Sequence, residues 1–322
     1  MTETVTALPG APGRARARGP RGGFDRVSML AVFVGVPLAL YLVFVIWPML
    51  QAAVYSLTDW SGFSGSFGFV GLNNYLELFR DESFLIAIRN SLIILAALPV
   101  LSLAIGLLLA VMVTIAGPSR GGVRGVRGSA FYRVVAFFPA VIPSIIIGII
   151  FAQVYDPNNG ILNGALTGIG LEQFQSFAWL GEASTAMAAT IAAMVWATSG
   201  FYMVLFIAAI RGIDTELFEA ARLDGAGRMR ITLSIVLPGI AANVKTSYVY
   251  AGIAALDSFV FLQAFNPSGG PKRSTLGITQ EIYSTAFQEG RFGLACAMGI
   301  LLTLLTFAFV GLTHRPRKKA AR

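Results

Sequence analysis

Two carboxylates in a short polar stretch, Glu219 and Asp224, are the first residues here whose type and spacing could do chemistry. A pair of acids can share general acid and base roles, but charged side chains on a solvated helix are the ordinary case. The sequence has one histidine, His314, and one cysteine, Cys296, so neither a histidine-dependent triad nor a His/Cys zinc cluster can form. We therefore expect no catalytic residue and no metal site.

The composition indicates that the helices carrying these residues belong to a membrane protein. Of 322 residues, 56% are apolar and 12% charged, and the mean hydropathy is +0.72. The net charge of +8 comes from basic clusters beside apolar runs, without a nucleic-acid-binding motif, so we expect no nucleic-acid partner.

Six apolar runs are long enough to cross a bilayer as helices, which needs about 20 residues each. They predict an all-α integral membrane protein with a basic arm at 1–27, a six-span domain at 28–312 and a basic tail at 313–322. The first run follows an Arg-rich start typical of secretory signals, but it is too long for one and is interpreted as a retained span. The six expected spans are Ser28–Pro48, Leu92–Ile115, Val134–Val154, Thr185–Ala209, Ala242–Phe265 and Phe292–Leu312.

Basic residues indicate which side each connection occupies, because Lys and Arg are retained on the cytoplasmic side. The third connection, Tyr155–Ser184, contains neither. The pattern predicts that both termini lie in the cytoplasm. The basic residues of the four predicted cytoplasmic segments are Arg14, Arg16, Arg18, Arg21 and Arg26; Arg120, Arg124, Arg127 and Arg133; Arg211, Arg222, Arg228 and Arg230; and Arg315, Arg317, Lys318, Lys319 and Arg322.

The fourth connection predicts a short amphipathic helix from 215 to 224. Asp214 can cap its first turn, and Gly225 can take the left-handed conformation that ends a helix. Ala220 and Ala221 remove side-chain bulk, so another surface can approach closely. Such a helix suits docking into the groove of a partner protein.

The same residues resemble the EAA loop of binding-protein-dependent ABC importer permeases. Glu219-Ala-Ala, then Gly225, then Ile235-x-Leu-Pro have that loop's spacing within residues 211–238. The resemblance implies that this loop couples the chain to an ATPase subunit. The implied coupling residues are Glu219, Ala220, Ala221, Asp224, Gly225, Leu237 and Pro238.

Further segments are similar to sugar-class permeases of the maltose and glycerol-phosphate importer type. Members of this family often carry Phe-Asp before the Gly-Gly-Pro segment. This chain has Leu256-Asp-Ser-Phe there instead, a form that resembles amino-sugar and oligosaccharide importers. The sequence does not identify the sugar, and it does not say whether the ATPase is dedicated to this transporter or shared with others. The segments that carry the likeness are Phe69-Val-Gly-Leu-Asn-Asn-Tyr, Phe131-Tyr-Arg, Asp156-Pro-Asn-Asn-Gly-Ile-Leu-Asn, Gly200-Phe-Tyr-Met-Val and Gly269-Gly-Pro.

This resemblance implies a bacterial plasma-membrane complex. A second permease subunit would complete a heterodimer, two ATP-binding subunits would dock at the inner face, and a solute-binding protein would deliver sugar from outside. No G-x-x-x-x-G-K-[ST] string occurs in this chain, so ATP and Mg²⁺ are expected on the separate ATPase and no cofactor is expected here.

A substrate site is expected near mid-membrane, between the fourth and fifth spans. Trp196, Thr198 and Phe201 would form one wall, and Asp257 and Ser258 the other, because sugar sites combine aromatic platforms with hydrogen-bonding groups. Asp257 stands out because an acid within a span is costly and indicates function. Bonding of Asp257 to a neighbouring helix or to the partner permease is the alternative.

Three other functions are compatible with parts of the pattern. An importer of glycerol phosphate or another polar solute would share the fold. An ion-coupled secondary transporter would also cross the membrane many times, but the spans show no inverted halves and few intramembrane acids. A membrane-embedded enzyme lacks the necessary site chemistry.

Overall fold

A computed structural model describes residues 24–115 and 128–314, so most of the basic arm, the Gly- and Arg-rich segment and the tail lie outside the described residues. Apart from one isolated bridge between Thr58 and Phe69, the regular structure of the described chain is helical. This confirms the predicted all-α class. The chain forms two compact units, residues 1–51 and 52–322, which are described separately.

The described part of the first unit, from Phe24 on, is a single helical run with two π-helical turns. Each π turn ends two residues before a proline, at Pro37 and at Pro48. Proline lacks an N–H and its ring collides with the carbonyl four residues earlier, so a widened turn accommodates it. The elements are α1 (Phe24–Leu30), η1 (Ala31–Gly35), α2 (Val36–Tyr41), η2 (Leu42–Ile46) and α3 (Trp47–Tyr55), which continues into the second unit.

The second unit is built around α5 (Glu82–Thr114) and α9 (Ala186–Arg211), its most extensive helix pair. Gly106 of α5 lies so close to α9 that a Cβ there would be 2.9 Å from the Cβ of Tyr202. Nearby, the hydroxyls of Ser102 and Thr198 are hydrogen-bonded at 2.8 Å. Small residues and interhelical hydrogen bonds of this kind associate helices where lipid offers no hydrophobic driving force.

Two predicted spans are broken rather than continuous. The helix Ser129–Val141, made of α6 (Ser129–Phe137) and η3 (Phe138–Val141), meets α7 (Ser144–Val154) at 101°. Pro143 at this break removes a backbone donor, so the helix cannot continue. The fifth predicted span is α13 (Ala241–Leu256) followed by α14 (Phe259–Phe265), bent by 49° at Asp257 and Ser258.

Span-like helices in the described chain therefore number four, or up to six if each bent pair is one span. The four continuous ones, Val27–Tyr55, Glu82–Thr114, Ala186–Arg211 and Phe292–His314, each overlap a predicted span and extend beyond it. The third and fifth predicted spans correspond to the two bent pairs, whose bends apolar length alone does not predict.

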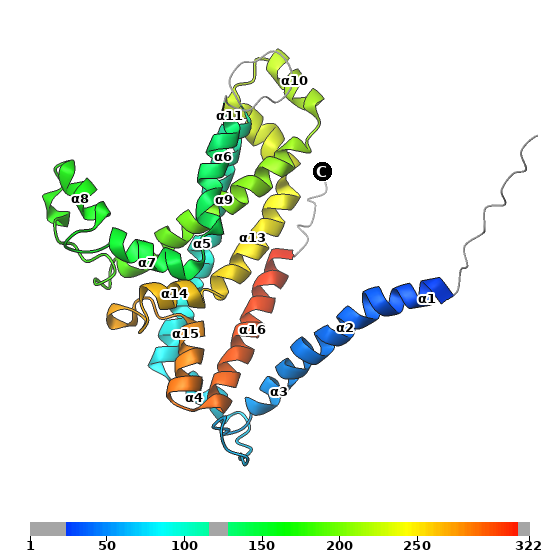
Figure 1. Ribbon diagram of the computed structural model, residues 1–322, viewed down its shortest axis with the longest axis vertical. Helices are drawn as coiled ribbons and strands as arrows, with labels where there is room; N and C mark the ends of the chain where they lie inside the picture. The colour runs from blue at the N-terminus through cyan, green and yellow to red at the C-terminus, as the bar shows by residue number, and fades with distance from the viewer. Residues whose placement is uncertain (1–23, 116–127, 315–322) are drawn as a thin grey trace, which may run out of the picture. The chain divides into compact units, whose positions relative to one another are not determined.

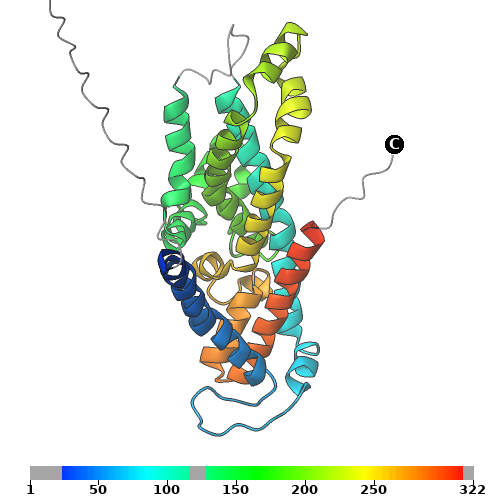
Figure 2. The same cartoon turned by 90° about the vertical axis from the view of Figure 1, so that its right-hand side faces the viewer.

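Further helical elements complete the second unit, and the last of them, α16, packs along α13 and α15 (Figures 1 and 2). One end carries α10 and the opposite end carries α4, while α8 projects from the side in Figure 1. These elements are α4 (Asn73–Leu78), α8 (Ile161–Gly168), η4 (Glu172–Phe174), α10 (Thr215–Leu223), α11 (Arg228–Ile231), η5 (Thr232–Val236), α12 (Leu237–Gly239), η6 (Pro271–Arg273), α15 (Ile278–Tyr283), η7 (Ser284–Gln288) and α16 (Phe292–His314).

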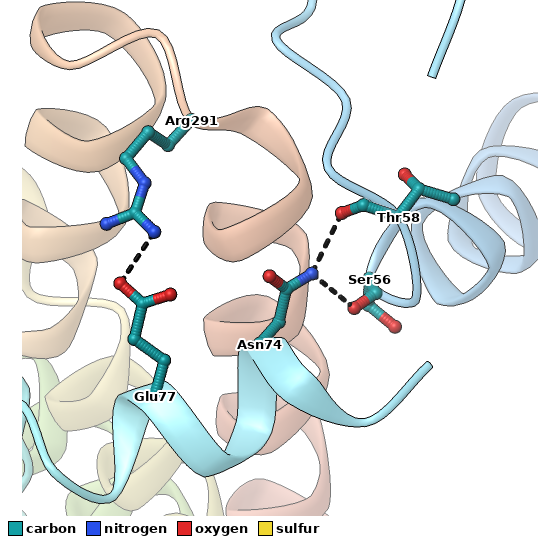
Figure 3. Close-up of polar contacts among 5 residues, drawn as sticks. All are labelled: Ser56, Thr58, Asn74, Glu77 and Arg291. Carbon is teal, nitrogen blue, oxygen red and sulfur yellow. Dashed lines mark hydrogen bonds and ion pairs between the residues drawn. The ribbon is translucent and has the colours of Figure 1, made fainter. Parts of the chain in front are cut away.

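Polar contacts tie the α4 end together (Figure 3). The Asn74 side chain donates to the carbonyl oxygens of Ser56 at 2.8 Å and Thr58 at 2.9 Å. Arg291, just before α16, forms an ion pair of 2.6 Å with Glu77 of α4. The first connection is thereby fixed to the start of the last span.

We expect Gly200→Leu to destabilise the fold by about 1–3 kcal/mol or more, the cost of overpacking a close contact. A Cβ at Gly200 in α9 would overlap the carbonyl oxygen of Ala136 in α6. Thermal unfolding of the purified protein in detergent can be followed through a thiol-reactive dye on Cys296, the single cysteine. Gly299→Leu is the matched control, because nothing lies within 4 Å of a Cβ there. Equal midpoints for the two variants would contradict this packing.

Candidate functional site

The predicted helix of the fourth connection is present as α10. The Asp214 carboxylate accepts a hydrogen bond from the Glu216 backbone N–H at 3.1 Å, which caps the first turn. Asp224 follows the last helical residue, and Gly225 has φ +73°, the left-handed conformation that ends the helix. The helix ends at Leu223, one residue before the predicted end.

One side chain anchors α10 to the rest of the second unit. Phe218 is fully buried in the apolar cluster at this end of the chain, together with Ile210 of α9 and Ile240 before α13. Ala221 packs against the same cluster. Phe218 and Ala221 therefore hold one face of α10 against the cluster to which residues of α9 and α13 also belong.

The opposite face of α10 is open. Glu219 and Ala220 are exposed, and so are Leu217 at 53% and Leu223 at 89%. The two adjacent alanines thus differ: Ala220 faces outward, while Ala221 faces the chain's own core. An exposed apolar face edged by carboxylates has the chemistry of a docking surface.

Leu237 and Pro238, the last predicted coupling residues, form the short α12 after the π turn η5. Pro238 follows η5 by two residues, as the prolines of the first unit follow their π turns. Val236 and Ile240 on either side are fully buried in the Phe218 cluster, so this segment continues the anchor of α10 into α13.

The predicted aromatic wall of the substrate site is divided between two pockets. Trp196 lines an apolar pocket of about 540 Å³ between α5, α6 and α9. Thr198 and Phe201 line another, of about 210 Å³, at the bend between η3 and α7. The Thr198 hydroxyl is engaged with Ser102 and also donates to the Met194 carbonyl at 2.9 Å. Pro139 lines both pockets.

Asp257 and Ser258 occupy the break between α13 and α14. The Asp257 side chain is exposed, whereas Ser258 is buried. Among the described residues no ion pair or hydrogen bond engages the Asp257 carboxylate, and Lys245 does not reach it. Neither residue lines the Thr198 pocket, although Phe261 of α14 does. The substrate role of all five residues stays a prediction.

Sequence reasoning missed two features of this architecture. The first is the anchoring role of Phe218, which helical spacing from Ala221 could have indicated. The second is a set of aromatic residues after the Gly-Gly-Pro segment, Tyr283, Phe287 and Phe292, beside a buried acid, Glu281. An acid and two rings spaced along one short polar connection were the available signal. In the described chain no group of three or more acidic, His or Cys side chains could hold a metal ion.

A helical membrane domain with two bent spans, a capped docking helix at one end and a polar break within a span defines a subunit of a transport system. The chain belongs to the family of binding-protein-dependent transport system inner membrane components, whose model matches residues 114–318. It is accordingly a multi-pass membrane protein and a transporter component rather than an enzyme.

Relatives in the same family match nearly the whole chain. The diacetylchitobiose uptake system permease protein of Streptomyces coelicolor is 50% identical over 311 residues, covering 96% of this chain and 88% of the relative. The multiple sugar-binding transport system permease protein of Streptococcus mutans is 33% identical, covering 85% and 89%. The sn-glycerol-3-phosphate permease protein of Yersinia pestis is 29% identical, covering 91% and 94%.

The fold also matches a solved structure. A crystal structure of a bacterial ABC transporter involved in alginate import aligns with a TM-score of 0.76, covering 93% of this chain and 98% of that one. At 22% sequence identity this match shows a shared fold.

We expect Gly225→Leu to lower transport about tenfold or more, because a side chain at φ +73° costs about 1–2 kcal/mol and displaces the end of α10. Gly227→Leu is the matched control: it is equally unhindered but has φ −73°. Glu219→Lys should act like Gly225→Leu, since it reverses the charge of an exposed side chain on the face that is expected to dock. Normal uptake and ATPase stimulation by complexes containing either variant would contradict a coupling role for α10.

Proposed function

We propose that this chain is one permease subunit of an ATP-driven sugar importer and that it carries an N-acetylated disaccharide of the diacetylchitobiose type. The observation that carries this proposal is the 50% identity to a diacetylchitobiose permease across 96% of the chain. Relatives named for multiple sugars and for glycerol phosphate are more distant, at 33% and 29% identity. An ion-coupled transporter is not favoured, because the family is defined by dependence on a binding protein.

The proposed complex contains a second permease, two copies of an ATP-binding subunit and an extracytoplasmic solute-binding protein. ATP and Mg²⁺ bind to the ATPase subunits, whose grooves receive the exposed face of α10. Both termini and α10 lie on the cytoplasmic side, and the end carrying α4 faces outward. The alternation of basic connections supports this orientation.

ATP acts by closing the ATPase subunits, which favours one of two states of the permease pair. It can shift that equilibrium only by its differential affinity for the two states. Movement of α10 is passed through Phe218 to α9 and α13, and so to the break at Asp257 and Ser258. We place the sugar at this break and at the Thr198 and Phe201 pocket, with the second permease supplying the other side.

Reconstitution tests this function. Proteoliposomes that hold this chain, its partner permease and the ATPase should take up labelled diacetylchitobiose only with the binding protein outside and Mg-ATP inside. Excess glycerol 3-phosphate should not compete, because it lacks the rings and acetamido groups. Asp257→Asn should change the affinity or the sugar preference while basal ATPase activity is kept.

Uptake driven by an ion gradient without ATP would contradict the proposed function. Uptake of glycerol 3-phosphate in preference to the disaccharide would agree with an ATP-driven importer but would contradict the proposed disaccharide substrate. An Asp257→Asn complex with unchanged affinity, rate and preference would remove Asp257 from the substrate site.

A further inference from the structure

A small polar pocket lies at the α4 end of the second unit, between the start of α5, the loop after α14, and α15. Its volume is about 240 Å³, and its walls include Gln263, Arg273, Gln280, Glu281, Ser284 and Gln288. The Gln280 amide donates to Gln263 at 3.1 Å and to the Asn266 carbonyl at 3.0 Å, which fixes the pocket's inner wall. None of the substrate or coupling residues predicted from the sequence lines it.

Glu281 is the unexplained group in this pocket. Its side chain lines the pocket, the residue is only 9% exposed, and no hydrogen bond or ion pair satisfies its carboxylate among the described residues. Burial raises the pKa of Glu281; the negative charge of Asp81 raises it too, Arg273 lowers it, and Glu289 raises it. A carboxylate that lines a pocket and has no partner among the described residues is free to accept hydrogen bonds from a ligand.

Aromatic rings form a continuous strip from this pocket in two directions. Tyr283, at the pocket's edge, lies 5.4 Å from Phe259 and 5.3 Å from Phe287, measured between ring centroids. Phe287 lies 5.4 Å from Phe292, which is 5.7 Å from Trp60. In order, the aromatic strip consists of Phe259, Tyr283, Phe287, Phe292, Trp60, Tyr55 and Phe67.

The aromatic strip runs from the break between α13 and α14 to the first connection. Phe259 directly follows Ser258 at the break between α13 and α14, where we place the sugar. The other end belongs to the first connection, which Asn74 and the Arg291–Glu77 ion pair hold in place (Figure 3). The Gly293 N–H also donates to the Trp60 carbonyl at 2.8 Å, so the rings on both sides of Phe292 are fixed.

The rings beside the pocket are open to a ligand. Tyr283 is 41% exposed and Phe287 is 65% exposed. Exposed ring faces next to carboxylate, amide and guanidinium groups suit a sugar ring, which has apolar faces and hydroxyl edges. The pocket is smaller than the roughly 300 Å³ at which drug-sized sites begin, so it has room for one ring and not for a disaccharide.

We propose that the Glu281 pocket, with Tyr283 and Phe287 as its platform, holds one ring of an N-acetylated sugar on the outer side of the chain before the sugar reaches the break at Asp257. This inference rests on the proposed function and adds a second sugar site to it. The ring stacks on the exposed aromatic faces, and its hydroxyl or acetamido N–H donates to the Glu281 carboxylate. From there Tyr283 and Phe259 lead to Ser258.

The test uses the whole reconstituted transporter and a diacetylchitobiose that carries a photoreactive diazirine, delivered by the binding protein. Illumination should crosslink the sugar to the peptide containing Tyr283 and Phe287. Tyr283→Ala and Phe287→Ala should each lower both crosslinking and uptake about tenfold, whereas Tyr283→Phe, which keeps the ring, should retain most of both. Phe79→Ala is the control, because Phe79 is exposed but belongs to no ring contact of the described chain.

Different results would refute the second sugar site and the proposed function. If wild-type complexes take up the sugar but no variant changes crosslinking or uptake, the second site is refuted and the proposed function stands. If wild-type complexes do not take up the sugar at all, the proposed function fails and this inference fails with it. Glu281 could instead receive a basic side chain of the binding protein. Glu281→Gln would then weaken stimulation by loaded and empty binding protein alike and leave crosslinking intact, which would also refute the sugar site.

Discussion

Close contact between α5 and α9 is the constraint on which the rest of the second unit depends. Gly106 and the Ser102–Thr198 hydrogen bond bring the two longest helices of this unit together without large side chains between them. Gly200 then lets α6 approach α9 from another side. These contacts hold α5, α6 and α9 close together, and the two bent helix pairs of the described chain break at Pro143 and at Asp257.

The helix α10 is attached to these packed helices through one buried side chain. Phe218 joins α10 to the ends of α5, α9 and α13 in one buried cluster, so α10 cannot move alone. The break at Asp257 and Ser258 lies at the far end of α13 from this cluster. In the proposed function a displacement applied at α10 reaches the place where a span is interrupted, which would couple an event at one face to a change within the membrane.

Local signals made α10 predictable, since Asp214 and Gly225 act through their own backbone neighbours. The bend at Asp257 was not, because no proline or glycine marks it and apolar residues resume directly after Asp257 and Ser258. Trp196 and Thr198 line different pockets because two residues along a helix turn through about 200°, and their substrate role stays a prediction. Glu281 and its aromatic platform depend on contacts between the fifth connection, the first connection and α14, so sequence spacing within one segment could not assemble them.

If α10 docks on an ATPase in the cytoplasm and the α4 end faces outward, α10 and the α4 end lie on opposite sides of the membrane. Thiol labelling with an impermeant maleimide measures this directly in a Cys296→Ser background, with one cysteine at Gly65 in the first connection or at Gly227 beside α10. Both glycines have nothing within 4 Å, so either substitution fits. Gly65→Cys should be labelled in intact cells, and Gly227→Cys only after the membrane is permeabilised. Labelling of Gly227→Cys in intact cells, with Gly65→Cys protected, would contradict the account.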